Sequence, residues 1–113
     1  MNIKIILIAL GEPNSTFSEI LFKYFCSIKF KKTNKKIVLV GCKDLLQQQM
    51  KKLRYKLTLN EISNIKYSKN NEINIINVNY KFKKIFNKIT SQSNEYIKNC
   101  FDLSFKIIKK NKS

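Results

Sequence analysis

Histidine and tryptophan are absent from this chain of 113 residues, and glycine, proline and arginine are scarce. There are two glycines, one proline and a single arginine, Arg54. Without histidine, the chain cannot form a Ser-His-Asp or Cys-His catalytic arrangement or a histidine-bound metal site of its own. The glycines do not form a G-x-x-x-x-G-K-[ST] phosphate loop or a G-x-G-x-x-G dinucleotide motif. The sequence therefore lacks the marks of several common enzyme classes.

Closely spaced cysteines and long apolar runs are also missing. Cys26, Cys42 and Cys100 lie far apart in apolar surroundings, which is typical of reduced core residues in a cytosolic protein. The longest early apolar run, "IILIAL", is much shorter than the roughly 20 residues of a membrane span, and no small-residue cleavage site follows it. We therefore expect a soluble, cytoplasmic protein without a membrane partner.

Positive charge, by contrast, is abundant, with 23 Lys and Arg against 7 Asp and Glu and a formal charge of +16. Nearly all of it is lysine, whereas arginine is the usual reader of guanine edges and of phosphates. Lysine, asparagine and isoleucine are also the residues of AT-rich codons, so we attribute much of the charge to composition and expect it to lie on solvated faces. Nucleic-acid binding is therefore the alternative and not the main expectation.

In that alternative, the chain is a small basic nucleic-acid-binding or interaction module without catalysis. Lysines would follow the phosphates, and aromatic side chains among them would stack on bases. The candidate lysines are Lys31, Lys32, Lys35, Lys36, Lys51, Lys52, Lys81, Lys83 and Lys84, and the candidate aromatic residues are Tyr80, Phe82 and Phe86. A structural subunit without chemistry is a third reading.

Strand-like and helix-like segments alternate along the chain. Unbroken apolar runs are typical of strands that are buried on both faces, and apolar residues three and four apart are typical of amphipathic helices. The pattern predicts strands over 3–10, 36–41 and 72–78, a short extended piece at 57–59, helices over 17–28, 43–55 and about 93–109, and loops over 29–36 and 60–71. This order predicts a single α/β layer with a mainly parallel sheet flanked by helices.

Each predicted helix has an apolar stripe that we expect to be buried. The stripes consist of Ile20, Leu21, Tyr24, Phe25 and Ile28; of Leu45, Leu46, Gln49, Met50 and Leu53; and of Tyr96, Ile97, Cys100, Phe101, Ser104, Ile107 and Ile108.

The loop "GEPNSTFSE", from Gly11 to Glu19, directly follows the first strand. Gly11 and Pro13 are suited to turning the chain, and Thr16 with Glu19 forms a T-x-x-E capping box for the next helix. In doubly wound folds, this loop lies at the carboxyl edge of the sheet, where ligands bind. From the residues alone, the favoured reading is a turn followed by a capped helix.

Four stretches together resemble the 4-hydroxythreonine-4-phosphate dehydrogenase family. Gly11, Glu12 and Pro13, with Glu19 at the matching interval, are similar to that family's G-[DE]-P-A-G-I-G-P-E loop. "IVLVGCKDLLQQQMKKLRYKLTL" and "INIINVNYKF" are similar to its next strands and helix, and "TSQSNEYIKNCFDLSFKIIKK" to a later helix. Asn14 to Ser18 depart from the motif, and Phe17 stands where the family has a glycine.

The resemblance implies part of an isocitrate/isopropylmalate dehydrogenase-like fold and the N-terminal part of a longer, homodimeric enzyme. Such enzymes oxidise 4-phosphooxy-threonine with NAD and a histidine-bound divalent metal, on the route to pyridoxal phosphate. The metal, substrate and most nicotinamide residues would lie beyond residue 113, so no catalytic or metal residue is carried over. We expect residues 1–113 to form a single incomplete domain that is inactive alone and binds neither cofactor tightly. Its weak cleft-rim candidates are Gly11, Glu12, Pro13 and Glu19.

An incomplete domain should also leave apolar surface without cover. The residues we expect to be uncovered are Ile5, Leu7, Val38, Leu39 and Ile75. Because uncovered patches and strand edges favour association, we expect marginal stability or self-association.

Overall fold

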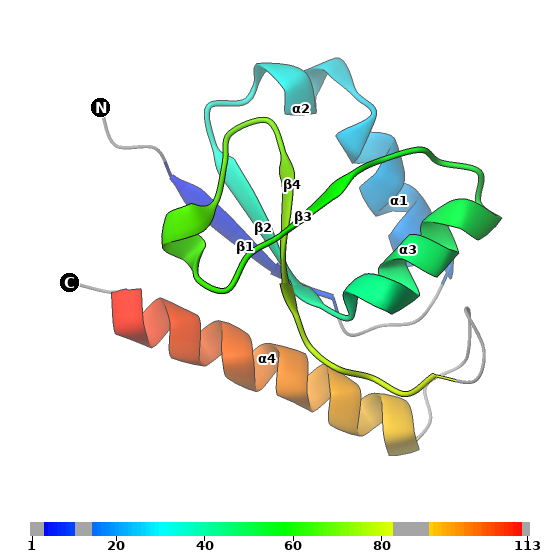
Figure 1. Cartoon of the computed structure of the whole chain (residues 1–113), viewed down its shortest axis with the longest axis vertical. Coiled ribbons are helices and arrows are strands. Elements are labelled where there is room, and N and C mark those ends of the chain that lie inside the picture. Colours follow the sequence, from blue (N-terminus) through cyan, green and yellow to red (C-terminus); the bar gives the residue numbers. More distant parts are fainter. Residues whose placement is uncertain (1–3, 11–14, 83–90, 112–113) are drawn as a thin grey trace.

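The computed structural model of the chain describes residues 4–10, 15–82 and 91–111, and for residues 15–16, 91–93 and 111 it describes the backbone alone. The elements follow one another as β1, α1, α2, β2, α3, β3, a short 3₁₀ helix η1, β4 and α4 (Figure 1). Strands and helices thus alternate along most of the chain, as the hydrophobic pattern predicts.

The four strands form one parallel sheet in the order β1-β2-β4-β3. The strands are β1 (Ile5–Ala9), β2 (Lys36–Gly41), β3 (Leu59–Glu61) and β4 (Ile73–Asn77). The inner strands β2 and β4 are almost wholly buried, whereas β1 and β3 are the two edges. A parallel sheet of this kind must be covered on both faces, which explains the continuous apolar runs of β2 and β4.

Helices cover the two faces of the sheet separately (Figure 1). On one face, residues of α1 (Ser15–Phe25), α2 (Ile28–Lys32) and α3 (Lys43–Lys52) pack with Leu39 and Ile75. On the other face, α4 (Ser91–Asn111) places Leu103 and Ile107 against Val38 and Ile76. The predicted α/β class with a parallel sheet flanked by helices is therefore confirmed.

Asn74 joins β4 to its surroundings at the amino edge of the sheet and is fully buried. Its Nδ2 donates to the carbonyl oxygens of Ile37 and Lys69, at 2.9 Å each. Its Oδ1 accepts from Asn60 Nδ2 and from the Lys69 backbone N–H, at 3.0 Å each. A buried amide is tolerated in a core only when it is hydrogen-bonded in this way.

Several predicted element boundaries are wrong. Residues 29–36, predicted as a loop, contain most of α2. Ser27 caps the start of this helix, because its hydroxyl oxygen accepts a hydrogen bond from the Phe30 backbone N–H at 3.3 Å. The extended piece predicted at 57–59 is β3, which begins two residues later and extends into the predicted loop 60–71, where η1 (Ile65–Tyr67) also forms. The predicted capping box is also wrong, because α1 begins at Ser15 and Thr16 lies inside its first turn.

Three of the five residues expected to lack cover are buried. Val38, Leu39 and Ile75 are 0% exposed, because α4 covers one face of the inner strands and α1 and α3 cover the other. Uncovered apolar surface lies instead at β1, where Ile5 is 40% exposed and Leu7 is only partly buried. The expectation that the first strand is buried on both faces is therefore also wrong.

The buried stripes of the first and last helices are narrower than predicted. Residues predicted as buried but found exposed are Ile20, Ile28, Phe101 and Ile108. Only the central row of each apolar stripe reaches the sheet, and the flanking apolar residues face outward. In the stripe predicted for 43–55, Leu45, Leu46, Met50 and the polar residue Gln49 are buried as expected, whereas Leu53 caps α3 and is only partly buried. Among the described residues, no helix is long and apolar enough to cross a membrane.

Candidate functional site

The carboxyl edge of the sheet is the place where a parallel α/β fold binds ligands, and the loops after β1, β2 and β4 leave the sheet there. Three of the four predicted rim residues, Gly11, Glu12 and Pro13, lie outside the described residues. The fourth, Glu19, is exposed on α1. The structure therefore does not test whether the four residues lie together.

Leu10 closes the gap between the ends of β1 and β2. Its backbone N–H donates to the Val40 carbonyl oxygen at 2.8 Å, and its side chain lies directly over Gly41. A Cβ atom at position 41 would lie 2.7 Å from the Leu10 side chain, which is closer than real contacts allow. Glycine at the end of β2 is thus explained by this close approach.

A hydrogen bond from the next residue connects β2 to α4. The backbone N–H of Cys42 donates to the Tyr96 hydroxyl at 2.7 Å, so that α4 is tied to the carboxyl end of β2. The Tyr80 ring stacks on Tyr96 with ring centroids 4.4 Å apart and an interplanar angle of 9°. Cys100 lies in the same apolar cluster. Tyr80, Tyr96 and Cys100 thus help to hold α4 against the carboxyl end of β2.

Burial keeps this cluster neutral. It raises the pKa of the Tyr96 hydroxyl well above its usual range, with the neighbouring Cys100 thiol adding to the shift. Burial likewise raises the pKa of Cys100 to about 11. Because a nucleophilic cysteine needs a lowered pKa to form a thiolate, Cys100 is not suited to nucleophilic catalysis.

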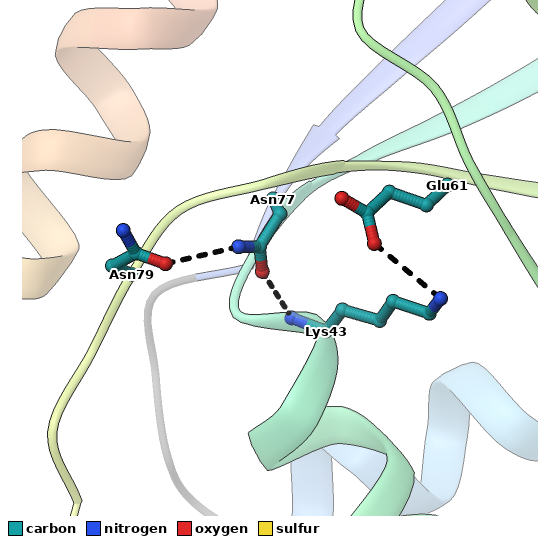
Figure 2. A network of polar contacts seen from close by, with 4 residues as sticks. All are labelled: Lys43, Glu61, Asn77 and Asn79. Atoms are coloured by element: carbon teal, nitrogen blue, oxygen red, sulfur yellow. Dashed lines mark hydrogen bonds and ion pairs between the residues drawn. The ribbon is translucent and has the colours of Figure 1, made fainter.

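A polar network lies at the carboxyl ends of three strands, as Figure 2 shows. The backbone N–H of Lys43 donates to Asn77 Oδ1 at 2.9 Å, and Asn77 Nδ2 donates to Asn79 Oδ1 at 3.1 Å. The Lys43 ammonium lies 3.4 Å from a carboxylate oxygen of Glu61, which comes from β3. The network therefore joins the start of α3 to β3 and to the end of β4.

The sequence analysis did not identify this network. The one usable signal in the sequence was position, because Lys43 lies two residues after the predicted strand 36–41 and Asn79 directly follows the predicted strand 72–78. Which strand ends meet depends on the strand order, since β4 lies between β2 and β3. That order is not encoded in any local motif.

Space for a ligand lies beside this network and not beneath α1. Between α1 and α3, Ser18 Oγ donates to Gln49 Oε1 at 2.7 Å, and Phe17 helps to fill the gap, leaving a cavity of about 10 Å³. An open groove of about 260 Å³ runs between the exit of β4 and α4. It is lined by Asn79, Tyr80, Lys81, Glu95, Tyr96 and Asn99.

The donor atoms of the described residues do not fit a divalent metal of the kind that the family resemblance implies. Histidine is absent from the sequence. In residues 4–10, 15–82 and 91–111, no three Cys, Asp or Glu side chains converge on one point. We therefore derive no step through a metal from these residues.

The aromatic residues of the nucleic-acid alternative do not form a free stacking row in the described part of the chain. One face of the Tyr80 ring is covered by Tyr96, and Phe82 is partly buried beside Tyr80. Phe86 lies outside the described residues, as do Lys83 and Lys84. The remaining candidate lysines other than Lys36 are exposed, as solvated residues are, and they lie on several elements.

Comparison with known proteins gives a match at the level of structure. No protein-family model matches the sequence, and no curated protein sequence matches it. A crystal structure of a 4-hydroxythreonine-4-phosphate dehydrogenase from Burkholderia phymatum matches 97% of this chain and 34% of its own, with a TM-score of 0.81 and 10% identity. A provisionally assigned 4-hydroxythreonine-4-phosphate dehydrogenase from Salmonella typhimurium matches 98% of this chain and 35% of its own, with a TM-score of 0.76 and 14% identity.

These matches confirm the resemblance at the level of the fold. The chain has the same arrangement of strands and helices as part of these dehydrogenase structures, and it spans about a third of their length. At such low identity, the likeness carries the fold alone, because one fold can support many functions.

Proposed function

We propose that residues 1–113 are the N-terminal α/β segment of an NAD-dependent dehydrogenase that resembles 4-hydroxythreonine-4-phosphate dehydrogenase. The observation that carries this proposal is the fold match over 97% of the chain, to a structure of which it covers 34%. The loop motif of Gly11, Glu12, Pro13 and Glu19 supports it independently, because it lies in the sequence where that family has its first loop. The segment is a single incomplete domain of an isocitrate/isopropylmalate dehydrogenase-like fold.

In this proposal, the carboxyl edge of the sheet is one wall of the active-site cleft. The loop from Gly11 to Glu19, which follows β1 in the sequence, would contribute to its rim, and the groove between the exit of β4 and α4 would be part of the cleft. The Lys43–Asn77–Asn79 network holds the strand ends that support this wall. Its role is positioning, since the Asn77 amide is engaged on both sides by neighbours within the chain and the Lys43 ammonium is paired with Glu61.

The rest of the enzyme supplies what this chain lacks. A further polypeptide segment holds the divalent metal and the phosphorylated substrate and completes the NAD site, and the whole acts as a cytoplasmic homodimer. In such an enzyme NAD would supply a hydride acceptor and the metal would supply a Lewis acid, and both would be held largely by residues of that further segment. The 113-residue chain alone therefore has no dehydrogenase activity and no tight cofactor site.

A chimera tests this proposal. The chain would replace the matching third of the Burkholderia phymatum enzyme, and NADH formation would be followed with 4-hydroxythreonine-4-phosphate, NAD and a divalent metal. We expect turnover by the chimera, and none by the isolated chain or by the enzyme lacking its matching third. A chimera that melts cooperatively but neither binds NAD nor forms NADH would contradict the proposed function. NADH formation by the isolated chain would contradict its incompleteness.

A further inference from the structure

A basic groove lies where the chain leaves α3 and turns toward β3. It has a volume of about 560 Å³. Its lining residues are Gln47, Met50, Lys51, Arg54, Tyr55, Lys56 and Leu57. Whereas α3 starts at the carboxyl edge of the sheet, its other end leads to Leu59, which pairs with Ile73 at the start of β4. The groove therefore lies at the opposite end of α3 from the Lys43–Asn77–Asn79 network.

The walls of this groove all come from one continuous stretch, residues 47–57, and the structure describes every residue of it. The groove is thus formed by the second half of α3 and the turn after it. Met50 is buried, and Tyr55 and Leu57 are partly buried against the core. The Tyr55 ring also packs on Phe22, with ring centroids 5.4 Å apart. The base of the groove is therefore apolar and held in place by the core.

Three cationic side chains line the groove, and no acidic side chain does. Lys51, Arg54 and Lys56 are all exposed. Among the side chains that the structure describes, the one ion pair joins Lys43 to Glu61, so these three cations have no carboxylate partner. An apolar segment packed over them would bury three unpaired charges, which is costly. An occupant of this groove must therefore bring negative charge.

The end of α3 does not need these cations. Lysine and arginine side chains often bind the last carbonyl groups of a helix. Here the Met50 carbonyl oxygen accepts from the Tyr55 backbone N–H at 2.9 Å, and the Lys51 carbonyl oxygen accepts from the Arg54 backbone N–H at 3.1 Å. Because the main chain closes the helix by itself, the cationic side chains are available to a ligand.

Arg54 is the most unusual of the three cations. It is the single arginine among 23 basic residues, and its φ of 64° lies in the left-handed region. Glycine is favoured in that conformation at the end of a helix, and asparagine also adopts it, as Asn71 does here with a φ of 60°. Arginine at such a position costs energy that glycine would not, and strain of this kind is concentrated at functional sites. The cost points to a role for the guanidinium.

We propose that this groove, which we call the α3-end groove, binds an organic phosphate, that is, a phosphate group carried on an apolar or aromatic body. The Arg54 guanidinium fork pairs with two phosphate oxygens, and Lys51 and Lys56 add positive charge. The apolar body lies on Met50 and Leu57. The volume falls within the range of about 300 to 1,000 Å³ that is usual for small-molecule sites. This site goes beyond the proposed function and does not rest on it, because it lies away from the carboxyl edge of the sheet.

The test uses the 113-residue chain and three probes, which are phenyl phosphate, inorganic phosphate and phenol. Amide chemical shifts measured by NMR give both the affinity and the place of binding. We expect phenyl phosphate to shift the amides of residues 47–57 with a Kd below about 1 mM, and to bind more weakly at high salt. Inorganic phosphate lacks the apolar body and should bind at least about tenfold more weakly. Phenol lacks the charge and should not bind at the same concentrations.

Matched variants locate the binding. Arg54→Gly removes the guanidinium and suits the left-handed backbone, so it should weaken binding of phenyl phosphate about tenfold and raise the melting temperature. Loss of binding in this variant is then not a result of unfolding. Arg54→Lys keeps the charge without the fork and should also weaken binding. Lys109→Ala removes one positive charge from α4, on the other face of the sheet, and should leave the affinity unchanged.

Four results would overturn the proposal. These are failure of phenyl phosphate to bind, affinity that Arg54→Gly does not change, equal binding of inorganic phosphate, and shifts that spread over the lysines of several elements. A single-stranded oligothymidine that binds more tightly than phenyl phosphate and shifts amides on several elements would also overturn it, because the cations would then belong to a nucleic-acid surface.

Discussion

The inner strands of the sheet and its outer strand β1 have similar sequences but different surroundings. Ile6 on β1 and Ile37 on β2 are direct partners in the parallel register, yet Ile37 is 3% exposed and Ile6 is 37% exposed. The same residue type therefore contributes to the core at one position and to an open edge at its neighbour. The difference teaches that burial is concentrated in the inner strands β2 and β4, and that position in the sheet, more than residue type, decides how much a strand contributes to the core.

The largest expected effect compares these two isoleucines directly. Ile37→Ala removes a buried side chain from the core beside Phe30 and Leu39, and we expect it to lower the free energy of unfolding by about 2 to 5 kcal/mol. Ile6→Ala should cost about 1 kcal/mol, because part of that side chain already contacts water. Urea denaturation of both variants gives the comparison. Equal losses would show that β1 is covered as completely as β2.

A smaller effect compares two asparagines at opposite ends of β4. Asn74→Ala leaves the buried carbonyl of Ile37 and the groups of Lys69 and Asn60 without this partner, and we expect a loss of about 1 to 3 kcal/mol in the free energy of unfolding. Asn77→Ala removes hydrogen bonds that are exposed to water, so we expect a loss of less than about 1 kcal/mol. Thermal melts would measure both. A larger loss for Asn77 would mean that the carboxyl edge stabilises the fold.

The fold class could be predicted from the sequence because each strand is encoded locally. The runs "IILIA", "KIVLVG" and "INIIN" are apolar, bounded by polar residues or turns, and separated by helix-like patterns. The helix α2 was missed because five of the eight residues from 29 to 36 are lysines and Phe30 is the single apolar anchor among them, and a polar cluster of this kind is typical of a loop. Its start depends on the Ser27 hydroxyl, which is a local contact with a weak sequence signal.

The edge position of β1 and the polar network could not be predicted, because both depend on strand order. Periodicity places Phe101 and Ile108 on the apolar side of α4 but does not say how wide a stripe the sheet can cover. Nor does it say that β1 is an edge, since its sequence resembles that of the buried β2. Lys43, Glu61 and Asn77 meet only because β4 lies between β2 and β3.

The central claim is that β1 is open on one side in these 113 residues, and amide hydrogen exchange of the isolated 113-residue chain tests it most directly. We expect slow exchange at Ile6, Ile8 and Leu10, whose N–H groups face β2, and fast exchange at Ile5, Leu7 and Ala9. Uniform slow exchange along β1 would contradict the account, because it would show that the outer side of this strand is already paired in the isolated chain.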